Sequence, residues 1–279
     1  MLFPLMALAL FLAASVANAA QVTVVLSADQ PAFREVLAGV RSVLPDAGLT
    51  ILGKGALDIG DADVVVAVGD QAAAASYPSR VQLVTCMVAD PSLLADRKCV
   101  RVDLLPDAFT LMSTANNLTK HLNTLAVFDS KKRFTSYAKY LAAAAKVSMQ
   151  SVSVHEVDGA QDLVEALRSL KDQAEALWVA PDPGLIDGKD FKFISDFCLA
   201  NGISLIAPLA PLVRMGALAS LAPGNRSMGQ AAGQAAGKLA SGKPCAPHLS
   251  AADSEVLINP GTAGTLGLTL TPSMGTLLR

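Results

Sequence analysis

Acidic and hydroxyl side chains recur directly after short apolar runs in this sequence. Asp70 is the clearest case, because it follows the run 64–69 and precedes an alanine-rich segment. If the runs are strands of parallel sheets, these side chains lie in loops at the carboxyl edges, where helices begin with free backbone N–H groups. Such an edge can bind a small polar molecule without a catalytic group. The candidate ligand residues at these positions are Ser27, Asp29, Gly69, Asp70, Gln71, Thr85, Asp129, Ser130, Asp182 and Pro208.

A structural role is the alternative for each of these residues. Serine and aspartate are preferred helix N-caps, because their side-chain oxygens accept hydrogen bonds from the first turn. Aspartate beside proline, as at Asp182, is also common in turns. For Asp70 the sequence predicts an N-cap that bonds the N–H of Ala72 or Ala73 and faces a cleft.

Motifs of familiar enzyme classes are missing from the chain. It contains neither a G-x-S-x-G nucleophile motif nor a G-x-G-x-x-G motif after the first apolar run. The segment "GQAAGQAAGK" has alanine and leucine where a phosphate-binding loop requires glycine and a hydroxyl residue. Its glycines, Gly229, Gly233 and Gly237, instead fall four residues apart, which predicts one face of a tightly packed helix.

Metal-ligand spacing is also missing. The histidines His121, His155 and His248 lie far apart, and no C-x-x-C pair is present. These patterns predict a protein that is not an enzyme and that needs no cofactor and no metal. An enzyme whose catalytic residues converge only in the fold is the remaining alternative.

The composition excludes several classes of partner. The chain has 279 residues, of which 52% are hydrophobic and 16% charged, so it can form a large core as one or two domains. Its 22 basic and 24 acidic residues give a net charge of −2, which predicts no binding to nucleic acid and no anionic-membrane patch. Aromatic residues make up only 5%, which argues against a stacking platform for rings or sugars.

The first residues have the pattern of an export signal. An apolar stretch is followed by small residues and by Ala17-Asn18-Ala19, which predicts a signal peptide over 1–19, cleavage after Ala19 and a periplasmic location. An uncleaved anchor is the alternative, although the apolar run is short for a bilayer span.

Export places the cysteines in an oxidising compartment, where disulfides persist. Cys86, Cys99, Cys198 and Cys245 allow three full pairings, and the nearest pair in the chain, Cys86 with Cys99, is the predicted one. Alternatively, some of them are small buried residues. Cys198 fits that role best, on the inner face of a predicted helix.

Apolar runs alternate with helical segments along the whole chain. Runs such as "VTVVLS", "ADVVVAVG" and "ALWVA" are short and continuous, which is typical of parallel strands buried on both faces. The alternation predicts an α/β protein with two doubly wound parallel-sheet lobes and a cleft between them. The first set of strands ends near Leu105, and the second begins near Leu122.

Several stretches resemble one family of proteins. "ADVVVAVGDQAAAAS" looks like the strand–glycine–helix element of ABC-transporter substrate-binding proteins with the type I periplasmic binding fold. "VTCMVADP", "MGALASLAPGNRSMGQAAGQAAGKLASGKP" and "VLINPGTAGTLGLTL" look like later elements of the broad subfamily that includes tryptophan- and tyrosine-type binders.

The resemblance implies a two-lobed protein. Lobe I consists of 20–104 and 223–245, and lobe II consists of 105–222 and 246–279. A monomer of this kind closes on a small polar solute and delivers it to an ABC permease in the inner membrane. An alternative function for this fold is a periplasmic partner protein that serves a sensor or envelope system without solute transport.

One residue departs from the family pattern. Amino-acid binders of the subfamily often carry a small hydroxyl residue after the strand-end glycine, where it helps to hold a carboxylate. Here that position is Asp70, and an acid attracts an amine and repels a carboxylate. The departure implies either an amine-bearing or cationic ligand, or a pair of lobes that no longer binds solute.

Overall fold

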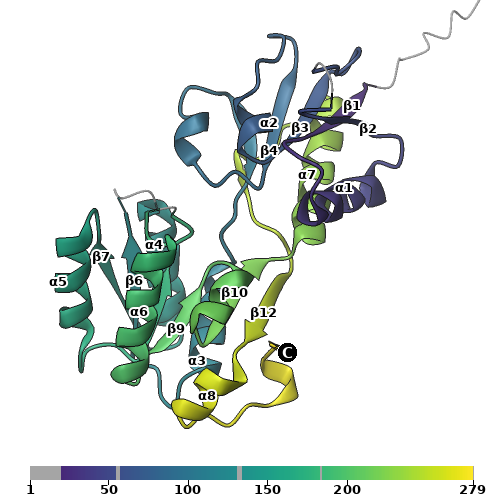
Figure 1. The fold of residues 1–279 in the computed structure, drawn as a ribbon. Coiled ribbons are helices and arrows are strands. Elements are labelled where there is room, and N and C mark those ends of the chain that lie inside the picture. The colour runs from purple at the N-terminus through teal and green to yellow at the C-terminus, as the bar shows by residue number, and fades with distance from the viewer. Residues whose placement is uncertain (1–19, 55–56, 131–133, 183, 279) are drawn as a thin grey trace, which may run out of the picture.

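A computed structural model describes residues 20–54, 57–130, 134–182 and 184–278. The predicted signal peptide at 1–19 lies outside these residues. The described chain forms two α/β lobes, each built around its own sheet (Figure 1). The predicted fold class is therefore confirmed.

Lobe I contains a parallel sheet with the strand order β11-β5-β4-β3-β1-β2. Its strands are β1 (Val22–Leu26), β2 (Gly48–Ile51), β3 (Val64–Val68), β4 (Gln82–Cys86), β5 (Cys99–Val102) and β11 (His248–Leu249). Its helices are α1 (Pro31–Val43), α2 (Asp70–Ala74), the short 3₁₀ helix η1 (Pro91–Leu94) and α7 (Asn225–Ala240). One face of the sheet packs on α1 and α7, and the other packs on α2 and its flanking loops.

Lobe II contains a sheet with the order β13-β12-β10-β9-β8-β6-β7, parallel except where β12 pairs with β10. Its strands are β6 (Thr124–Asp129), β7 (Ser151–Glu156), β8 (Ala176–Val179), β9 (Ser204–Ala207), β10 (Ala219–Pro223), β12 (Ser254–Ile258) and β13 (Thr276–Leu277). Its helices are α3 (Ala108–Asn117), α4 (Thr135–Val147), α5 (Ala160–Leu170), α6 (Gly188–Ala200), η2 (Ala210–Met215), α8 (Pro260–Thr265) and η3 (Pro272–Met274).

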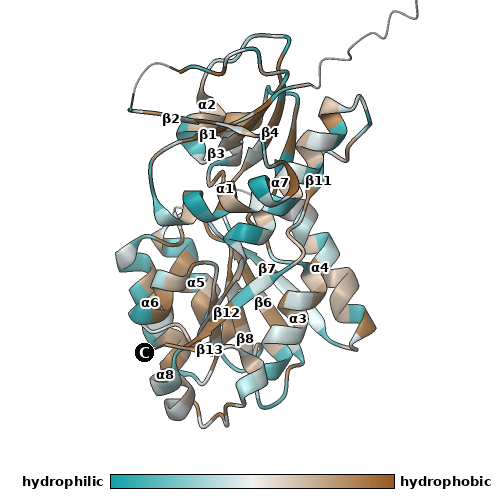
Figure 2. Ribbon diagram, turned by 90° about the vertical axis from the view of Figure 1, so that its right-hand side faces the viewer, coloured by the Kyte–Doolittle hydropathy of each residue, from teal (hydrophilic) through white to brown (hydrophobic). Residues whose placement is uncertain are grey.

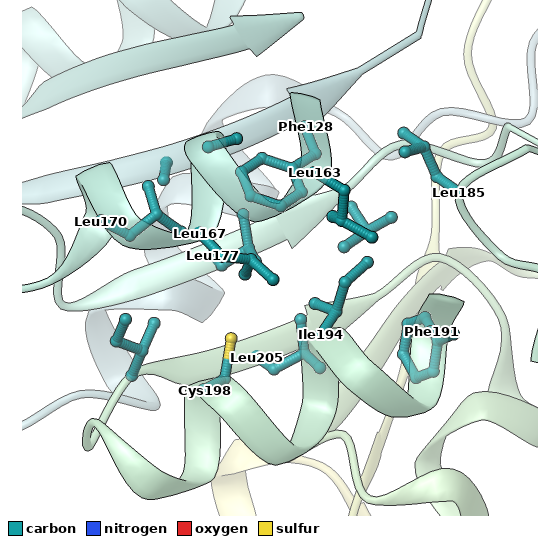
Figure 3. Packing of buried hydrophobic residues seen from close by; sticks show 14 of the residues in the cluster. Phe128, Leu163, Leu167, Leu170, Leu177, Leu185, Phe191, Ile194, Cys198 and Leu205 are labelled. Atoms are coloured by element: carbon teal, nitrogen blue, oxygen red, sulfur yellow. The ribbon is translucent and has the colours of Figure 1, made fainter. Parts of the chain in front are cut away.

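The strands are apolar because both faces of each sheet are covered. Every residue of β3 is buried, as expected for a continuous Val/Ala run. In lobe II, Phe128 packs under α5 and α6 with Leu167 and Ile194 (Figure 3). Figure 2 shows hydrophobic strands inside each lobe and hydrophilic segments on the covering helices. No helix among the described residues combines the length and apolar character needed to cross a membrane.

The chain crosses between the lobes at 103–107, at Gly224 and at 250–253. The predicted boundary at Cys245 is wrong, because β11 pairs with β5 and Ala251 belongs to the core of lobe I. Lobe I therefore continues to about residue 251. A two-residue strand has no periodicity, so the sequence pattern did not show it.

The glycine stripe of α7 packs against α1, which confirms the predicted tightly packed helix. A Cβ added at Gly229 would lie 2.1 Å from the carbonyl oxygen of Val36, and one added at Gly39 would lie 2.1 Å from that of Arg226. The two backbones are therefore in direct contact. The stripe positions a helix in lobe I and does not form a phosphate-binding loop.

The predicted Cys86–Cys99 disulfide is wrong. The cysteines are free, and Cys86 pairs in register with Val102 while Cys99 pairs with Leu83. The two side chains also belong to core clusters on opposite faces of the sheet. Neighbouring strands hold them three positions out of register, about 10 Å along the strand, which is too far for a disulfide. Cys198 is buried on the inner face of α6, as predicted.

Candidate functional site

The carboxyl edge of lobe I brings Ser27, Gly69 and Asp70 together. The Ser27 hydroxyl donates to the carbonyl oxygen of Val68 at 2.9 Å and accepts from the N–H of Ala72 at 2.9 Å. Gly69 has a φ of +86°, and a Cβ there would lie 2.7 Å from the Ser27 hydroxyl. Glycine is required at this turn because both the backbone conformation and the space exclude a side chain.

Asp70 does not have the predicted capping role. Gly69 is the N-cap of α2, and Asp70 is already its first helical residue. Its carboxylate instead accepts from the N–H of Ala89 at 2.7 Å, in the loop after β4. Ser27, not Asp70, bonds the N–H of Ala72. Asp70 therefore links the start of α2 to the loop after β4, and its Oδ1 already has backbone partners.

The other predicted residues of lobe I differ in environment. Asp29 is paired with Arg34 and Lys54, and the hydrogen bond from Arg34 is the main cause of the lowered pKa of its carboxyl. Gln71 is exposed. Thr85 is 1% exposed within β4, and its hydroxyl lies 3.5 Å from the carbonyl oxygen of Val100.

On lobe II the predicted residues lie at the ends of adjacent strands. β6 pairs with β8, so Asp129 and Asp182 occupy the same carboxyl edge. Both are buried. Asp129 accepts from the N–H of Phe134 at 3.2 Å, and Asp182 accepts from that of Gly184 at 2.8 Å. Ser130 and Pro208 are also buried at this edge. The acids therefore accept backbone hydrogen bonds at this edge, as the structural alternative predicts.

A cavity of about 640 Å³ lies where the lobes meet the crossing segment 103–107; it is called the hinge cavity below. Lobe I contributes Thr85, Ala89, Arg101 and His248, lobe II contributes helices α3 and α4 with Pro181, and Ser250 lies at the return crossing. Of the predicted ligand residues, only Thr85 lines it. Ala89 also connects the cavity wall to Asp70.

Aromatic side chains form the lobe II wall of the hinge cavity: Phe109, Phe134, Tyr137 and Tyr140. Tyr137 donates to the carbonyl oxygen of Pro106 at 2.7 Å, and its ring centroid lies 5.4 Å from that of Trp178. Burial raises the pKa of Tyr137. The low average aromatic content did not predict this cluster, because composition says nothing about clustering, and the fold places two of the chain's three tyrosines here.

The lobe I side of the hinge cavity is charged. The Asp103 carboxylate lies 3.1 Å from Nδ1 of His248, which joins the crossing segment 103–107 to β11. Burial raises the pKa of Asp103, and the neighbouring His248 and Arg101 oppose this effect. Arg101 donates to the carbonyl oxygen of Leu94 at 2.6 Å.

Sequence reasoning missed Arg101, Asp103 and His248. Asp103 directly follows an apolar run, as Asp70 does, so the same criterion could have identified it. Arg101 lies inside β5, and the search for polar residues after apolar runs does not include residues within a strand. His248 is 145 residues from Asp103, and only the fold brings them together. Among the described residues, no cluster of His, Cys, Asp or Glu side chains could hold a metal ion.

No protein-family model matches the chain, and no match to a curated protein was found. Similar solved structures exist. A ligand-free, open substrate-binding protein with adhesive properties from Clostridium difficile, CD0873, has a TM-score of 0.67 at 14% identity, covering 93% of this chain and 99% of that one. An ABC domain in complex with L-Trp from Streptococcus pneumonia has a TM-score of 0.59 at 18% identity, covering 92% and 100%.

A conserved domain protein from Vibrio cholerae has a TM-score of 0.58 at 14% identity, covering 94% of this chain and 100% of its own. The chain therefore has the two-lobed type I periplasmic binding fold, as the resemblance implied. At these identities the likeness concerns the fold, and the ligand has to be argued from the residues themselves.

Proposed function

We propose that the protein is an exported solute-binding protein that encloses a small molecule between its lobes and delivers it to an ABC importer. One observation carries the proposal: the hinge cavity is bounded by lobe I, lobe II and the crossing segment together. A molecule bound there contacts both lobes at once. Its volume of about 640 Å³ also suits a small organic molecule.

A site between the lobes couples ligand binding to the relative position of the two lobes. A ligand that contacts both lobes when they are closed stabilises the closed state relative to the open one by its differential affinity. The crossings at 103–107, at Gly224 and at 250–253 restrict the lobes to hinge-like rotation. A permease that recognises the closed arrangement then receives only loaded protein.

The fold of CD0873 and of the L-Trp complex supports this proposal, since both are named as binding or ABC-system proteins. Export through residues 1–19, a periplasmic location, a monomeric state, an inner-membrane permease as partner and the lack of catalysis belong to the same proposal. The enclosed solute is small and is recognised by the residues of the hinge cavity.

A thermal-shift screen against small organic acids, amines, amino acids and sugars tests the proposal. A ligand at 100 times its Kd stabilises the folded state by about 2.7 kcal/mol, which raises the melting temperature measurably. The single tryptophan, Trp178, contacts the cavity residue Tyr137 and provides a second readout by fluorescence. If no small molecule shifts the melting temperature, the proposal fails.

A second candidate is a partner protein of the same fold that serves a sensor or envelope system. One observation favours it: Ser27, Asp70 and Asp129 at the two edges already bond backbone N–H groups. Capture of a receptor, with no permease and with no ligand found in the screen, would support this alternative.

A further inference from the structure

Arg101 has unused donors at the hinge cavity. Its side chain is half-buried, and among the described residues only the carbonyl oxygen of Leu94 accepts a hydrogen bond from it. A guanidinium carries five N–H donors in a planar fork that matches a carboxylate. Thr85 pairs in register with Arg101 on the neighbouring strand, so its hydroxyl lies on the same face of the sheet.

The carboxylates of the cavity are already engaged. Asp103 lies 3.1 Å from Nδ1 of His248, and Asp107 accepts from the N–H of Thr110 at 3.0 Å. An ammonium ligand would have to share a carboxylate that already accepts a hydrogen bond. An anion instead meets the open donors of Arg101. Because Asp103 and Asp107 flank Arg101, the preference for an anion comes from direct hydrogen bonds to Arg101 rather than from long-range electrostatic attraction.

The opposite wall suits a flat apolar group. Phe109 and Tyr140 are 57% and 68% exposed, although aromatic side chains of this size usually bury most of their surface. Tyr137 is held between Pro106 and Trp178, so this part of the wall is rigid. Aromatic rings pack favourably face to edge or offset against such a wall.

We propose that the hinge cavity binds a small organic anion with a flat apolar body, its anionic group on Arg101 and its body against Phe109, Tyr137 and Tyr140. This inference rests on the solute-binding function proposed above and names the ligand class. It replaces the amine-bearing ligand that the sequence suggested from Asp70, because Asp70 does not line the hinge cavity.

Phenylacetate, phenethyl alcohol and phenethylamine test the charge preference, because they share one ring and differ at the other end. Binding is measured by calorimetry and by Trp178 fluorescence. Phenylacetate is expected to bind about tenfold or more tightly than the other two, as for a hydrogen bond to a charged group. The amine or the alcohol binding as tightly as phenylacetate would overturn the inference.

Substitutions test which cavity residues bind the anionic group and the ring. Arg101→Gln is expected to abolish the preference for phenylacetate, and Arg101→Lys to keep part of it. Arg97→Gln is the matched control, since Arg97 donates to the carbonyl oxygens of Ala74 and Ala75 and does not line the cavity. Tyr140→Ala is expected to weaken all three compounds. Unchanged phenylacetate affinity in a folded Arg101→Gln variant would also overturn the inference.

The two proposals fail separately. If the screen yields a solute that binds the wild type and Arg101→Gln equally and is weakened by Tyr140→Ala, the ligand class is wrong and solute binding stands. If neither the screen nor the phenyl compounds yield a ligand, both proposals fail.

Discussion

Ser27 joins two parts of the lobe I edge through one hydroxyl. It donates to Val68 at the end of β3 and accepts from Ala72 in the first turn of α2. Ser27→Ala is expected to lower the free energy of unfolding by about 1–2 kcal/mol, because it leaves a buried N–H without a partner. Asp70→Asn keeps an acceptor for the N–H of Ala89 and is expected to cost less than about 1 kcal/mol. Urea unfolding compares the two, and a larger loss in Asp70→Asn would contradict the observed capping.

The free cysteines give a chemical test of the corrected pairing. Cys86 and Cys198 are buried, and burial raises the pKa of each thiol to about 12. Cys99 and Cys245 are partly exposed. A thiol reagent without reductant is expected to label only Cys99 and Cys245 in the native protein, and all four cysteines after denaturation. Only two reactive thiols after denaturation would show that a disulfide exists.

Asp103 makes stability depend on pH. Its pKa is raised above the ordinary value of 3.8, mainly by burial, so the folded state holds its proton more tightly than the unfolded state. Stability therefore falls as the pH rises from 3.8 through the raised folded-state value, and this cost persists at higher pH. Asp103→Asn removes the effect. Relative to the wild type, the variant is expected to gain stability over that acidic range in urea titrations, and a loss there would contradict the raised pKa.

At the scale of elements, the contact between α1 and α7 depends on glycine. A Cβ at Gly229 would lie 2.1 Å from the carbonyl oxygen of Val36, so Gly229→Ala must separate the helices. It is expected to lower the free energy of unfolding by about 1–3 kcal/mol. At Gly237 the nearest atom would be Cδ2 of Leu44, at an ordinary 3.6 Å.

Gly237→Ala is therefore the matched control on the same helix. It is expected to be neutral or to stabilise the protein by up to about 1 kcal/mol, because alanine favours a helix over glycine. Thermal or urea unfolding of both variants measures the difference. Equal losses at the two positions would contradict the backbone contact.

At the scale of the whole molecule, the hinge cavity predicts that ligand binding makes the protein more compact. A ligand that contacts both lobes favours closure about the crossings at 103–107, at Gly224 and at 250–253. Small-angle X-ray scattering is expected to show a smaller radius of gyration with a saturating ligand from the screen. Arg101→Gln with phenylacetate is the control. A ligand that binds tightly without compaction would contradict closure.

Local pattern in the sequence was enough to predict the α/β class and the two lobes. Buried parallel strands need continuous apolar runs, and a close helix contact needs regularly spaced glycines such as Gly229, Gly233 and Gly237. Both features can therefore be recognised in the local sequence. The positions of Ser27, Asp129 and Asp182 at or just after strand ends followed from the ends of those runs.

Only the tertiary structure determined which partner each side chain has. Register put Cys86 and Cys99 on opposite faces of a sheet, and a loop after the next strand gave the carboxylate of Asp70 its partner, Ala89. The hinge cavity joins residues from β5, the crossing segment 103–107, α3, α4 and β11, and two of them, Asp103 and His248, are 145 residues apart. Local sequence patterns do not predict such contacts, because the packing of the whole chain determines the strand order and the positions of the lobe crossings.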